Sequence, residues 1–89
     1  LRRNSLYREV LVSAMTKEKV YWLSPVPGFC ETCDNPITDV MIDGKTTMGP
    51  WACMCPTCHT LGPGIGRLGL GLGQKYKKQK DGKWLKIEG

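Results

Sequence analysis

Several features on which common classes of protein depend are scarce or missing in this sequence. It contains one histidine, His59, and no convincing constellation of acids and bases, so we do not expect an enzyme. No apolar run approaches the roughly 18 residues of a membrane-spanning helix, so we expect a soluble chain without a membrane partner. No segment has the form of a signal peptide, which disfavours the oxidising compartments where disulfide frameworks form.

The cysteines that the chain does contain follow a pattern typical of metal binding. Cys30 and Cys33 form one Cys-x-x-Cys pair, and Cys55 and Cys58 form a second after twenty-one intervening residues. Two such turns can present four thiolates to one Zn²⁺ as a tetrahedron with Zn–S distances of about 2.3 Å. Pro56 fixes φ at the start of the second turn, which helps to aim backbone N–H groups at the sulfurs. We therefore predict one structural zinc ion, held by all four cysteines.

Other uses of these cysteines fit the sequence less well. A redox Cys-x-x-Cys motif needs a strand–helix setting that lowers a thiol pKa, and neither pair opens a helix-periodic run. A disulfide framework would leave one of the five cysteines over. A catalytic zinc usually has three protein ligands and a water, whereas four cysteines close the shell. An iron–sulfur cluster or an iron-loaded form of the same site also takes four cysteines and stays open beside zinc.

Two further side chains lie beside the second pair in sequence. If residues 51–54 form a strand, Cys53 shares a face with Cys55 and could compete for the metal, but a small buried thiol is the commoner role. His59 directly follows Cys58, and we expect it at the surface or in support of the ligands rather than on the metal.

Length and charge set limits on the fold and on the partners. With 89 residues the chain makes at most one small domain, which buries too little apolar surface to be comfortably stable without a cross-link such as a metal. The formal net charge of +5 and the isoelectric point of about 9.1 favour anionic partners such as nucleic acid. Residues 1–20 carry five basic and two acidic side chains, residues 21–73 two and four, and residues 74–89 six and two. The basic charge therefore lies at the two ends of the chain.

Residues 1–20 form an N-terminal extension that the sequence explains in two ways. Apolar side chains recur there at helical spacing after Asn4 or Ser5 as N-cap, which predicts a short amphipathic helix. Residues 15–19 also resemble a bacterial translation start, in which case residues 1–14 would be an upstream extension from a mis-called start or the remnant of a longer precursor. We assign no function to this segment and expect residues 21–89 to form a single zinc-binding domain.

The segment before the first cysteine pair is expected to cover the metal. The apolar run 20–23 ends at Pro25, because each proline disfavours the helical conformation of the residue before it. Trp22 and Phe29 flank this proline-containing stretch. We predict that the two rings form a small hydrophobic lid over the zinc site.

Between the cysteine pairs the sequence predicts a β-hairpin. Asp43-Gly44 joins the β-favouring runs 38–42 and 46–48, and this dipeptide suits a type I′ turn, whose central residues both have positive φ. Gly49-Pro50 is then expected to break the ladder before residues 51–54 resume it toward the second pair. Two cysteine turns joined by antiparallel β structure are the arrangement of a zinc ribbon.

Residues 62–73 contain six glycines. Residues 64–69 match G-x-G-x-x-G, but a dinucleotide fingerprint needs a βαβ unit, and no Gly-Lys-Ser/Thr follows for a Walker loop. Leucines alternate with glycines over residues 68–73, so an extended segment would have a leucine face and a bare backbone face. We predict a strand or loop whose glycines let another backbone or ring pack closely, with a mobile, partner-binding loop as the alternative.

Residues 74–89 predict a basic hairpin. A two-residue turn at Asp81-Gly82 would pair residues 76–79 with residues 84–87, opposing Tyr76 to Ile87, Lys78 to Leu85 and Gln79 to Trp84. In that register one face of the hairpin carries Tyr76, Leu85 and Ile87, and the other carries Trp84, Lys75, Lys77 and Lys86.

An aromatic ring among lysines is typical of a surface that binds single-stranded nucleic acid, where stacking contributes roughly 1–3 kcal/mol per base. The predicted nucleic-acid-binding residues are Lys75, Lys77, Lys78, Trp84 and Lys86. A solvated face whose lysine stems cover the indole is the alternative.

Five short segments carry a resemblance to a known group of proteins. They are Cys30-x-x-Cys33, Asp43-Gly44-Lys45-Thr46, Met48-Gly49-Pro50-Trp51-Ala52, Cys55-Pro56-x-Cys58-His59 and Gly73-Gln74-Lys75-Tyr76. Together they resemble the small zinc-ribbon proteins of tailed bacteriophages and prophages, most of which have no assigned function. The resemblance covers roughly residues 29–89 and implies a β-rich zinc-binding fold of viral or prophage origin, without implying an activity.

The sequence as a whole therefore predicts a small β-rich zinc ribbon, with two cysteine knuckles joined by a β-hairpin and a C-terminal basic hairpin. Our first functional hypothesis is binding of single-stranded or duplex nucleic acid in the cytoplasm of a bacterial host. The second is a protein-interaction or virion-accessory module that docks a phage or host protein on an apolar surface of Trp22, Trp51 and the glycine-rich segment.

Overall fold

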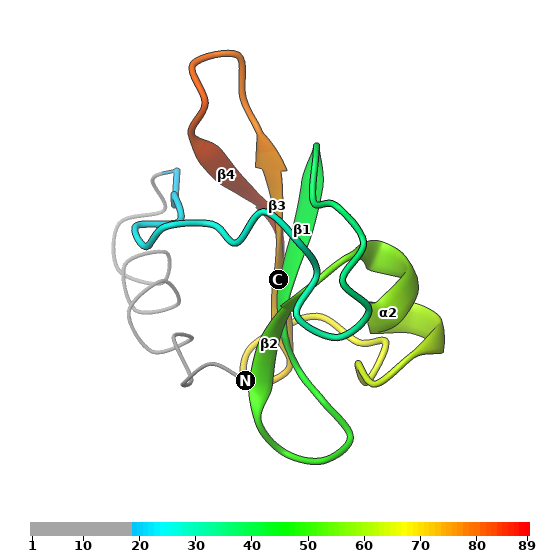
Figure 1. Cartoon of the computed structure of the whole chain (residues 1–89). Coiled ribbons are helices and arrows are strands. Elements are labelled where there is room, and N and C mark those ends of the chain that lie inside the picture. The colour runs from blue at the N-terminus through cyan, green and yellow to red at the C-terminus, as the bar shows by residue number, and fades with distance from the viewer. Residues whose placement is uncertain (1–18) are drawn as a thin grey trace.

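The computed structural model describes residues 19–89 and contains a four-stranded antiparallel sheet with one short helix (Figure 1). The strands follow the order β2-β1-β3-β4 across the sheet. Their bounds are β1 Val40–Lys45, β2 Trp51–Met54, β3 Gly73–Lys78 and β4 Trp84–Glu88, and helix α2 spans Pro56–Leu61. The predicted β-rich fold is confirmed. The helix predicted near the N-terminus lies almost entirely outside the described residues, and no helix within residues 19–89 has the length and apolarity to span a membrane.

Strand β1 is the central strand, and this position corrects the predicted hairpin turn. β1 runs straight through Asp43-Gly44, which pair with Cys53 and Ala52 of β2 on one side and with Gln74 and Gly73 of β3 on the other. A turn at Asp43-Gly44 would remove most of both ladders, so tertiary pairing overrides the local preference.

The turn between β1 and β2 lies instead at residues 46–50. The backbone N–H of Thr46 donates to the Pro50 carbonyl at 3.1 Å, and the N–H of Gly49 donates to the Thr46 carbonyl at 3.0 Å. Gly49 has a φ of 108°, a conformation that favours glycine. Gly49-Pro50, expected to break the ladder, therefore belongs to the hairpin loop itself.

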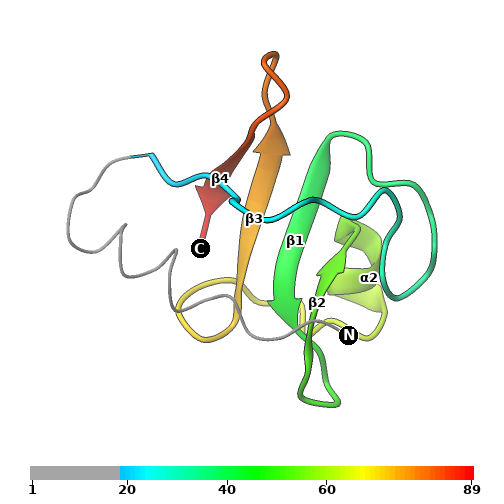
Figure 2. The same cartoon turned by 60° about the vertical axis from the view of Figure 1, so that its left-hand side comes forward.

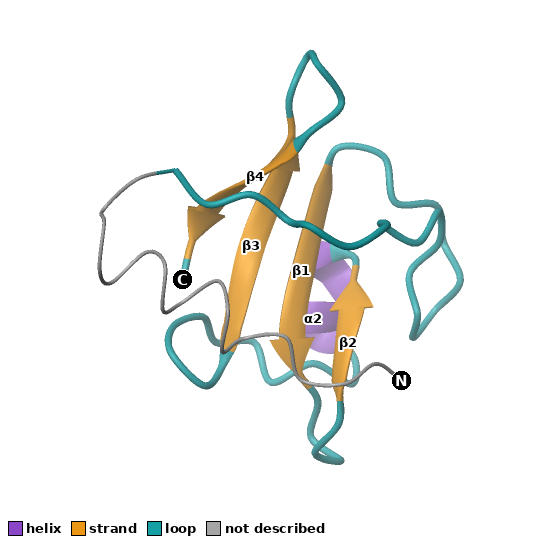
Figure 3. Ribbon diagram, turned by 90° about the vertical axis from the view of Figure 1, so that its left-hand side faces the viewer, coloured by secondary structure: helices purple, strands orange, loops and turns teal. Residues whose placement is uncertain are grey.

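The two faces of the sheet are packed by different partners. Met41, Cys53 and Tyr76 lie on one face, which we call the tryptophan face, because they form one buried cluster with Trp22. Ala52 and Met54 lie on the opposite face, the helix face, and pack with Cys30 and with Cys58 of α2. Figure 3 shows α2 behind β1 and β2, while the segment that precedes β1 crosses in front of the sheet. The core is therefore two clusters separated by one sheet.

The position of Trp22 corrects the predicted lid over the metal. Its ring meets that of Tyr76 edge-on, with centroids 5.4 Å apart, on the tryptophan face. Its backbone N–H donates to the Trp84 carbonyl at 3.0 Å, and the Lys86 N–H donates to the Val20 carbonyl at 2.8 Å, so residues 20–22 extend the sheet beyond β4. Phe29 is 56% exposed and is also not part of a lid.

Burial also corrects the docking surface predicted from two tryptophans. Trp22 and Trp51 are only 7% and 6% exposed, so neither ring offers a surface to a partner. Their side chains belong to the interior of the fold.

The glycine-rich segment is a loop that turns back into β3, and its glycines allow close backbone approach as predicted. A Cβ atom at Gly64 would lie 2.5 Å from the Cα atom of His59, and one at Gly73 would lie 3.2 Å from the Cα atom of Gly44. A tight turn over residues 69–73, closed by the Gly73 N–H donating to the Gly69 carbonyl at 3.0 Å, replaces the extended leucine–glycine ladder.

The register of the C-terminal hairpin differs from the prediction by one residue. Lys78 pairs with Trp84, Lys77 with Leu85 and Tyr76 with Lys86, and a bulge follows between Lys75 and Tyr76. The connection is a longer loop: the Gln79 N–H donates to the Lys83 carbonyl at 2.7 Å, and the Lys83 N–H donates to Oδ1 of Asp81 at 2.9 Å. A one-residue slip moves side chains to the other face of a strand.

The slip changes which residues accompany Trp84. Residues directly opposite in an antiparallel pair point to one face, so Trp84 shares its face with Lys78 and Tyr76, not with Lys75 and Lys77. Trp84 is half-buried and packs against the Trp22 cluster. Lys86 shares the face of Trp84 as predicted, but the predicted exposed indole among Lys75 and Lys77 is wrong.

These positions predict different roles for the two aromatic residues that flank the proline-rich stretch. Trp22→Ala should lower the free energy of unfolding by about 3–5 kcal/mol, because it removes a large ring from the tryptophan face. Phe29→Ala should change it by about 0.5 kcal/mol or less, as expected for a surface substitution. Urea denaturation of the zinc-saturated proteins measures both, and equal losses would contradict the placement of Trp22 in the core.

Candidate metal centre

The first cysteine knuckle is the tip of a small loop without helix or strand. The Ile37 N–H donates to the Gly28 carbonyl at 2.9 Å, and the Cys30 N–H donates to the Asn35 carbonyl at 2.7 Å, so residues 28–37 fold back on themselves. The Asp34 N–H closes the turn on the Cys30 carbonyl at 2.9 Å. Asp34 has a φ of 67°, the left-handed conformation that aspartate tolerates better than most non-glycine residues.

The second knuckle joins β2 to α2. Cys55 is the N-cap of α2, Pro56 occupies the first helical turn, and the His59 N–H donates to the Cys55 carbonyl at 3.1 Å. Cys58 thus projects from the first turn of a helix. This placement corrects the expectation that neither pair opens a helix, although α2 has only 6 residues.

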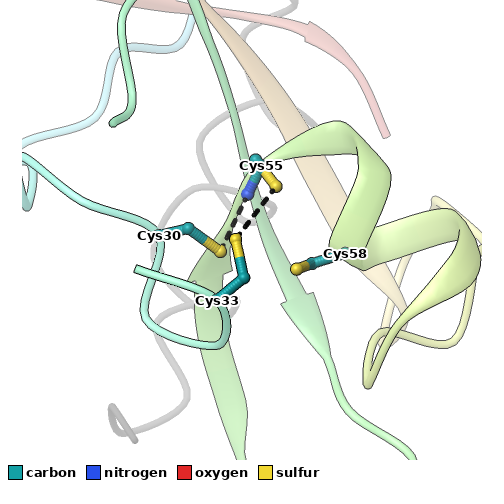
Figure 4. Close-up of side chains that lie close together, drawn as sticks. All are labelled: Cys30, Cys33, Cys55 and Cys58. Atoms are coloured by element: carbon teal, nitrogen blue, oxygen red, sulfur yellow. Dashed lines mark hydrogen bonds between the residues drawn. The ribbon is translucent and has the colours of Figure 1, made fainter. Parts of the chain in front are cut away.

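The structure brings the four predicted ligands together. The Sγ atoms of Cys30, Cys33, Cys55 and Cys58 all lie within 4.8 Å of one another, and those of Cys33 and Cys55 are 3.7 Å apart (Figure 4). A tetrahedron with Zn–S distances of about 2.3 Å has sulfur–sulfur edges of about 3.8 Å, so the four sulfurs fit one tetrahedral ion. All five cysteines are free thiols. The residues present therefore fit a metal held by four cysteines.

Hydrogen bonds prepare one of these sulfurs as a thiolate. Burial by itself would raise the pKa of the Cys30 thiol, but hydrogen bonds from the Thr32 hydroxyl and from neighbouring backbone N–H groups lower that pKa to about 6. The Thr32 Oγ1 lies 3.2 Å from the Cys30 Sγ. The Cys55 N–H donates to the same Cys30 Sγ at 3.3 Å. Donors that point at a sulfur favour its negative form.

The thiols of Cys58 and Cys33 have raised pKa values. A hydrogen bond from Thr32 lowers the pKa of Cys58, but burial and the neighbouring thiols outweigh it and raise that pKa to about 12. Hydrogen bonds with the Asn35 backbone and with Cys58 lower the pKa of Cys33, but burial and the thiols of Cys30 and Cys55 raise it overall. A metal that binds all four sulfurs must displace protons at neutral pH, so its affinity falls as the pH falls.

Cys53 and His59 lie apart from the four sulfurs. Cys53 is 0% exposed on the tryptophan face, which makes it the expected buried thiol rather than a fifth ligand. His59 is 4% exposed, and its Nε2 lies 3.1 Å from the Arg67 carbonyl oxygen, so it ties α2 to the glycine-rich loop. It supports the helix that carries Cys58 and is buried rather than at the surface.

Three polar residues of the first knuckle shape the site without having been predicted. Thr32 contacts the Cys30 sulfur, Asp34 adopts positive φ after Cys33, and Glu31 bonds to the backbone of β2. The signal in the sequence is the polar composition of Glu31-Thr32 inside the first pair and Asp34-Asn35 after it. Asx and hydroxyl side chains are typical of turns that redirect the backbone.

The predicted nucleic-acid-binding residues lie on the β3–β4 hairpin but not on one surface. Lys75 and Lys77 lie on the helix face, and Lys78, Trp84 and Lys86 lie on the tryptophan face. Lys75 Nζ is 3.5 Å from the carboxylate of Glu88.

Comparison with known proteins gives no match: no family model, no curated protein and no solved structure matches this chain. The fold and the site by themselves define a small β-rich protein with four cysteines arranged in two knuckles to hold a metal. The resemblance to phage and prophage zinc ribbons stays a prediction.

Substitution of single cysteines separates the four ligands from the fifth thiol. The parent protein should bind about one zinc per chain, and Cys55→Ser should lose that stoichiometry because it opens the tetrahedron. Chelation should unfold the parent, since metal binding and folding are coupled in so small a domain. Metal analysis and circular dichroism measure both effects.

Cys53→Ser and His59→Ala are the controls, because neither side chain reaches the four sulfurs. Both should keep one zinc per chain when folded. Zinc retained by Cys55→Ser, or lost from folded Cys53→Ser, would show that the ligand set is wrong.

Proposed function

We propose that this protein is a zinc-stabilised module that binds nucleic acid through the β3–β4 hairpin. The observation that carries the proposal is the concentration of lysines there: Lys77, Lys78, Lys80 and Lys83 are exposed within one hairpin. Clustered lysines attract phosphates and release counterions when they bind. Figure 2 shows this hairpin extending past the end of β1, which keeps its tip accessible to a long polyanion.

The acidic groups near the hairpin do little to offset this charge. The carboxylate of Glu88 lies beside Lys75, and Oδ1 of Asp81 accepts the Lys83 N–H within the loop. Exposed Asp39 also lies beside the hairpin, where its carbonyl accepts the Lys78 N–H at 2.8 Å. Six basic side chains of residues 74–89 still outnumber their two acidic ones and Asp39. The field around the hairpin is therefore cationic.

Packing of Trp84 changes the expected binding mode. Because its indole is half-buried against the Trp22 cluster, it is a poor platform for stacking bases. Contacts to phosphates remain, and these give affinity without strong dependence on sequence. We therefore infer that duplexes and single strands both bind through their backbones, and that a preference for unstacked bases is weak.

A protein-interaction role is the second candidate, and exposed apolar residues at the other end of the sheet favour it. Met48 and Leu70 lie on loops and Leu61 ends α2, and the three side chains are 84%, 72% and 82% exposed. The Thr47 N–H donates to the Pro63 carbonyl at 2.8 Å, and the Lys45 N–H donates to the Leu72 carbonyl at 2.9 Å, so backbone bonds hold these segments near the same end of β1. A phage or host protein is the partner class that the resemblance supports.

Catalysis is not part of either proposal. The single histidine is buried with Nε2 beside a carbonyl oxygen, and four cysteines would leave a metal no open position. The resemblance to phage and prophage zinc ribbons supports action in the cytoplasm of a bacterial host.

Removal of charge at the two ends of the sheet tests the nucleic-acid proposal. Lys77→Ala with Lys80→Ala should weaken binding to all sequences alike, and should reduce the slope of log affinity against log salt by about 0.9 per lost phosphate contact on duplex DNA. The matched control is Lys45→Ala with Arg67→Ala, which removes the same charge from exposed sites away from the hairpin. It should leave the slope nearly unchanged.

Fluorescence anisotropy with labelled single-stranded and duplex oligonucleotides measures both pairs. Equal losses in the two pairs would mean that only net charge matters and that the hairpin is not the site. No binding by the parent near about 50 mM salt, at the low end of the usual range, would favour the protein-interaction role instead.

A further inference from the structure

The two knuckles must meet within a few tenths of an ångström to form a tetrahedron, yet they are held in different ways. The second knuckle is fixed by β2 and α2, whereas residues 19–39 contain neither helix nor strand. The first knuckle therefore needs an anchor that sets its position against the second.

That anchor is the outer edge of β2. β2 is the first strand in the sheet order, so only one of its edges pairs with β1. On the other edge, the Glu31 N–H donates to the Cys53 carbonyl at 3.0 Å, and the Cys53 N–H donates to Oε1 of Glu31 at 2.6 Å. Two residues farther on, the Cys55 N–H donates to the Cys30 sulfur at 3.3 Å.

These bonds place the knuckle beside β2 as a short additional strand would. Glu31 uses both its backbone and its side chain to engage both backbone polar groups of Cys53. A carboxylate accepts a backbone N–H more strongly than a neutral oxygen does, and the distance of 2.6 Å is short for such a bond. The next contact along the same edge already involves a metal-binding sulfur.

We propose that Glu31 is a positioning residue of the metal centre, which clamps the first knuckle to β2 and so brings Cys30 and Cys33 to Cys55 and Cys58. It acts through the Cys53 backbone and not as a ligand. Four thiolates around Zn²⁺ already carry a net charge of about −2, so another carboxylate near the metal brings no electrostatic gain. The role of the side chain is acceptance of the Cys53 N–H.

The test compares zinc affinities in competition with a chromophoric chelator, on the full chain. Glu31→Ala should bind zinc about 10- to 100-fold more weakly, the usual loss when a group that orients metal ligands is removed. Glu31→Gln keeps an oxygen acceptor and should recover most of that loss. Glu88→Ala, which removes the same charge on β4, should bind as the parent does.

A control is needed for general destabilisation, because any weakening of the fold lowers apparent zinc affinity when binding and folding are coupled. Thr46→Ala removes a buried hydroxyl that donates to the Pro50 carbonyl at 2.7 Å, at the opposite end of β2 from the knuckles. When the two variants are compared under conditions that give their zinc-loaded forms the same free energy of unfolding, Glu31→Ala should release zinc faster than Thr46→Ala. It should also perturb the thiolate charge-transfer bands of the Co²⁺-substituted protein, which Thr46→Ala should leave unchanged.

The outcomes separate this role from the metal centre itself. A parent protein that binds no zinc would overturn both. If the parent binds zinc and Glu31→Ala binds it within about threefold as tightly, the clamp is wrong while the four-cysteine centre stands. The proposal is also overturned if Glu31→Gln is as weak as Glu31→Ala, or if Thr46→Ala matches Glu31→Ala in release rate and spectrum.

Discussion

Convergence of four thiolates on one point is the constraint on which the rest of this structure depends. Within the part of the chain that the structure describes, residues 19–39 before β1 contain no helix or strand, and they meet the helix face through the first knuckle. Without a metal, burial and contacts with neighbouring thiols outweigh the hydrogen bonds that lower the pKa values of Cys33 and Cys58, and both pKa values are raised. A divalent metal bound by the four sulfurs would offset the charge of the thiolates and supply the cross-link that a domain of this size needs.

The sheet divides the remaining interactions into two sets. On the tryptophan face Trp22, Met41 and Tyr76 form an apolar core on the opposite side of the sheet from α2. On the helix face α2 lies over Gly44 and Met54, and the glycine-rich loop packs so closely on α2 that a side chain at Gly64 would collide with the His59 backbone. The first knuckle occupies the outer edge of β2, and residues 20–22 occupy that of β4, so both edges of the sheet are partly covered. Covered edges discourage pairing with other chains.

The cysteine pairs were predictable because their spacing specifies a tetrahedron whatever the intervening fold. The β-rich character was predictable as well, since the runs around residues 40, 52, 76 and 85 all favour strands. The turn at Asp43-Gly44 was predicted wrongly, because local turn chemistry cannot reveal that β3, thirty residues later, pairs across the same dipeptide. The role of Glu31 was equally invisible, since it depends on which edge of β2 is left unpaired by β1.

The C-terminal hairpin shows how a small error in register becomes an error in function. Asp81-Gly82 lies in the loop as predicted, but the loop closes between Gln79 and Lys83, and the pairing moves by one residue. Because side chains alternate along a strand, that step takes Trp84 from a solvent-exposed lysine surface to the Trp22 cluster. Lysine content could be read from the sequence, whereas the surface it forms could not.

The central claim is that Cys30, Cys33, Cys55 and Cys58 together hold one zinc ion and that no other side chain joins them. X-ray absorption at the zinc edge of the purified protein tests it most directly, because nitrogen and sulfur ligands differ in distance and in scattering. Four sulfur atoms at about 2.3 Å and no lighter ligand are the predicted result. A nitrogen or oxygen scatterer at about 2.0–2.1 Å would contradict the account, since it would place His59 or a water in the coordination shell.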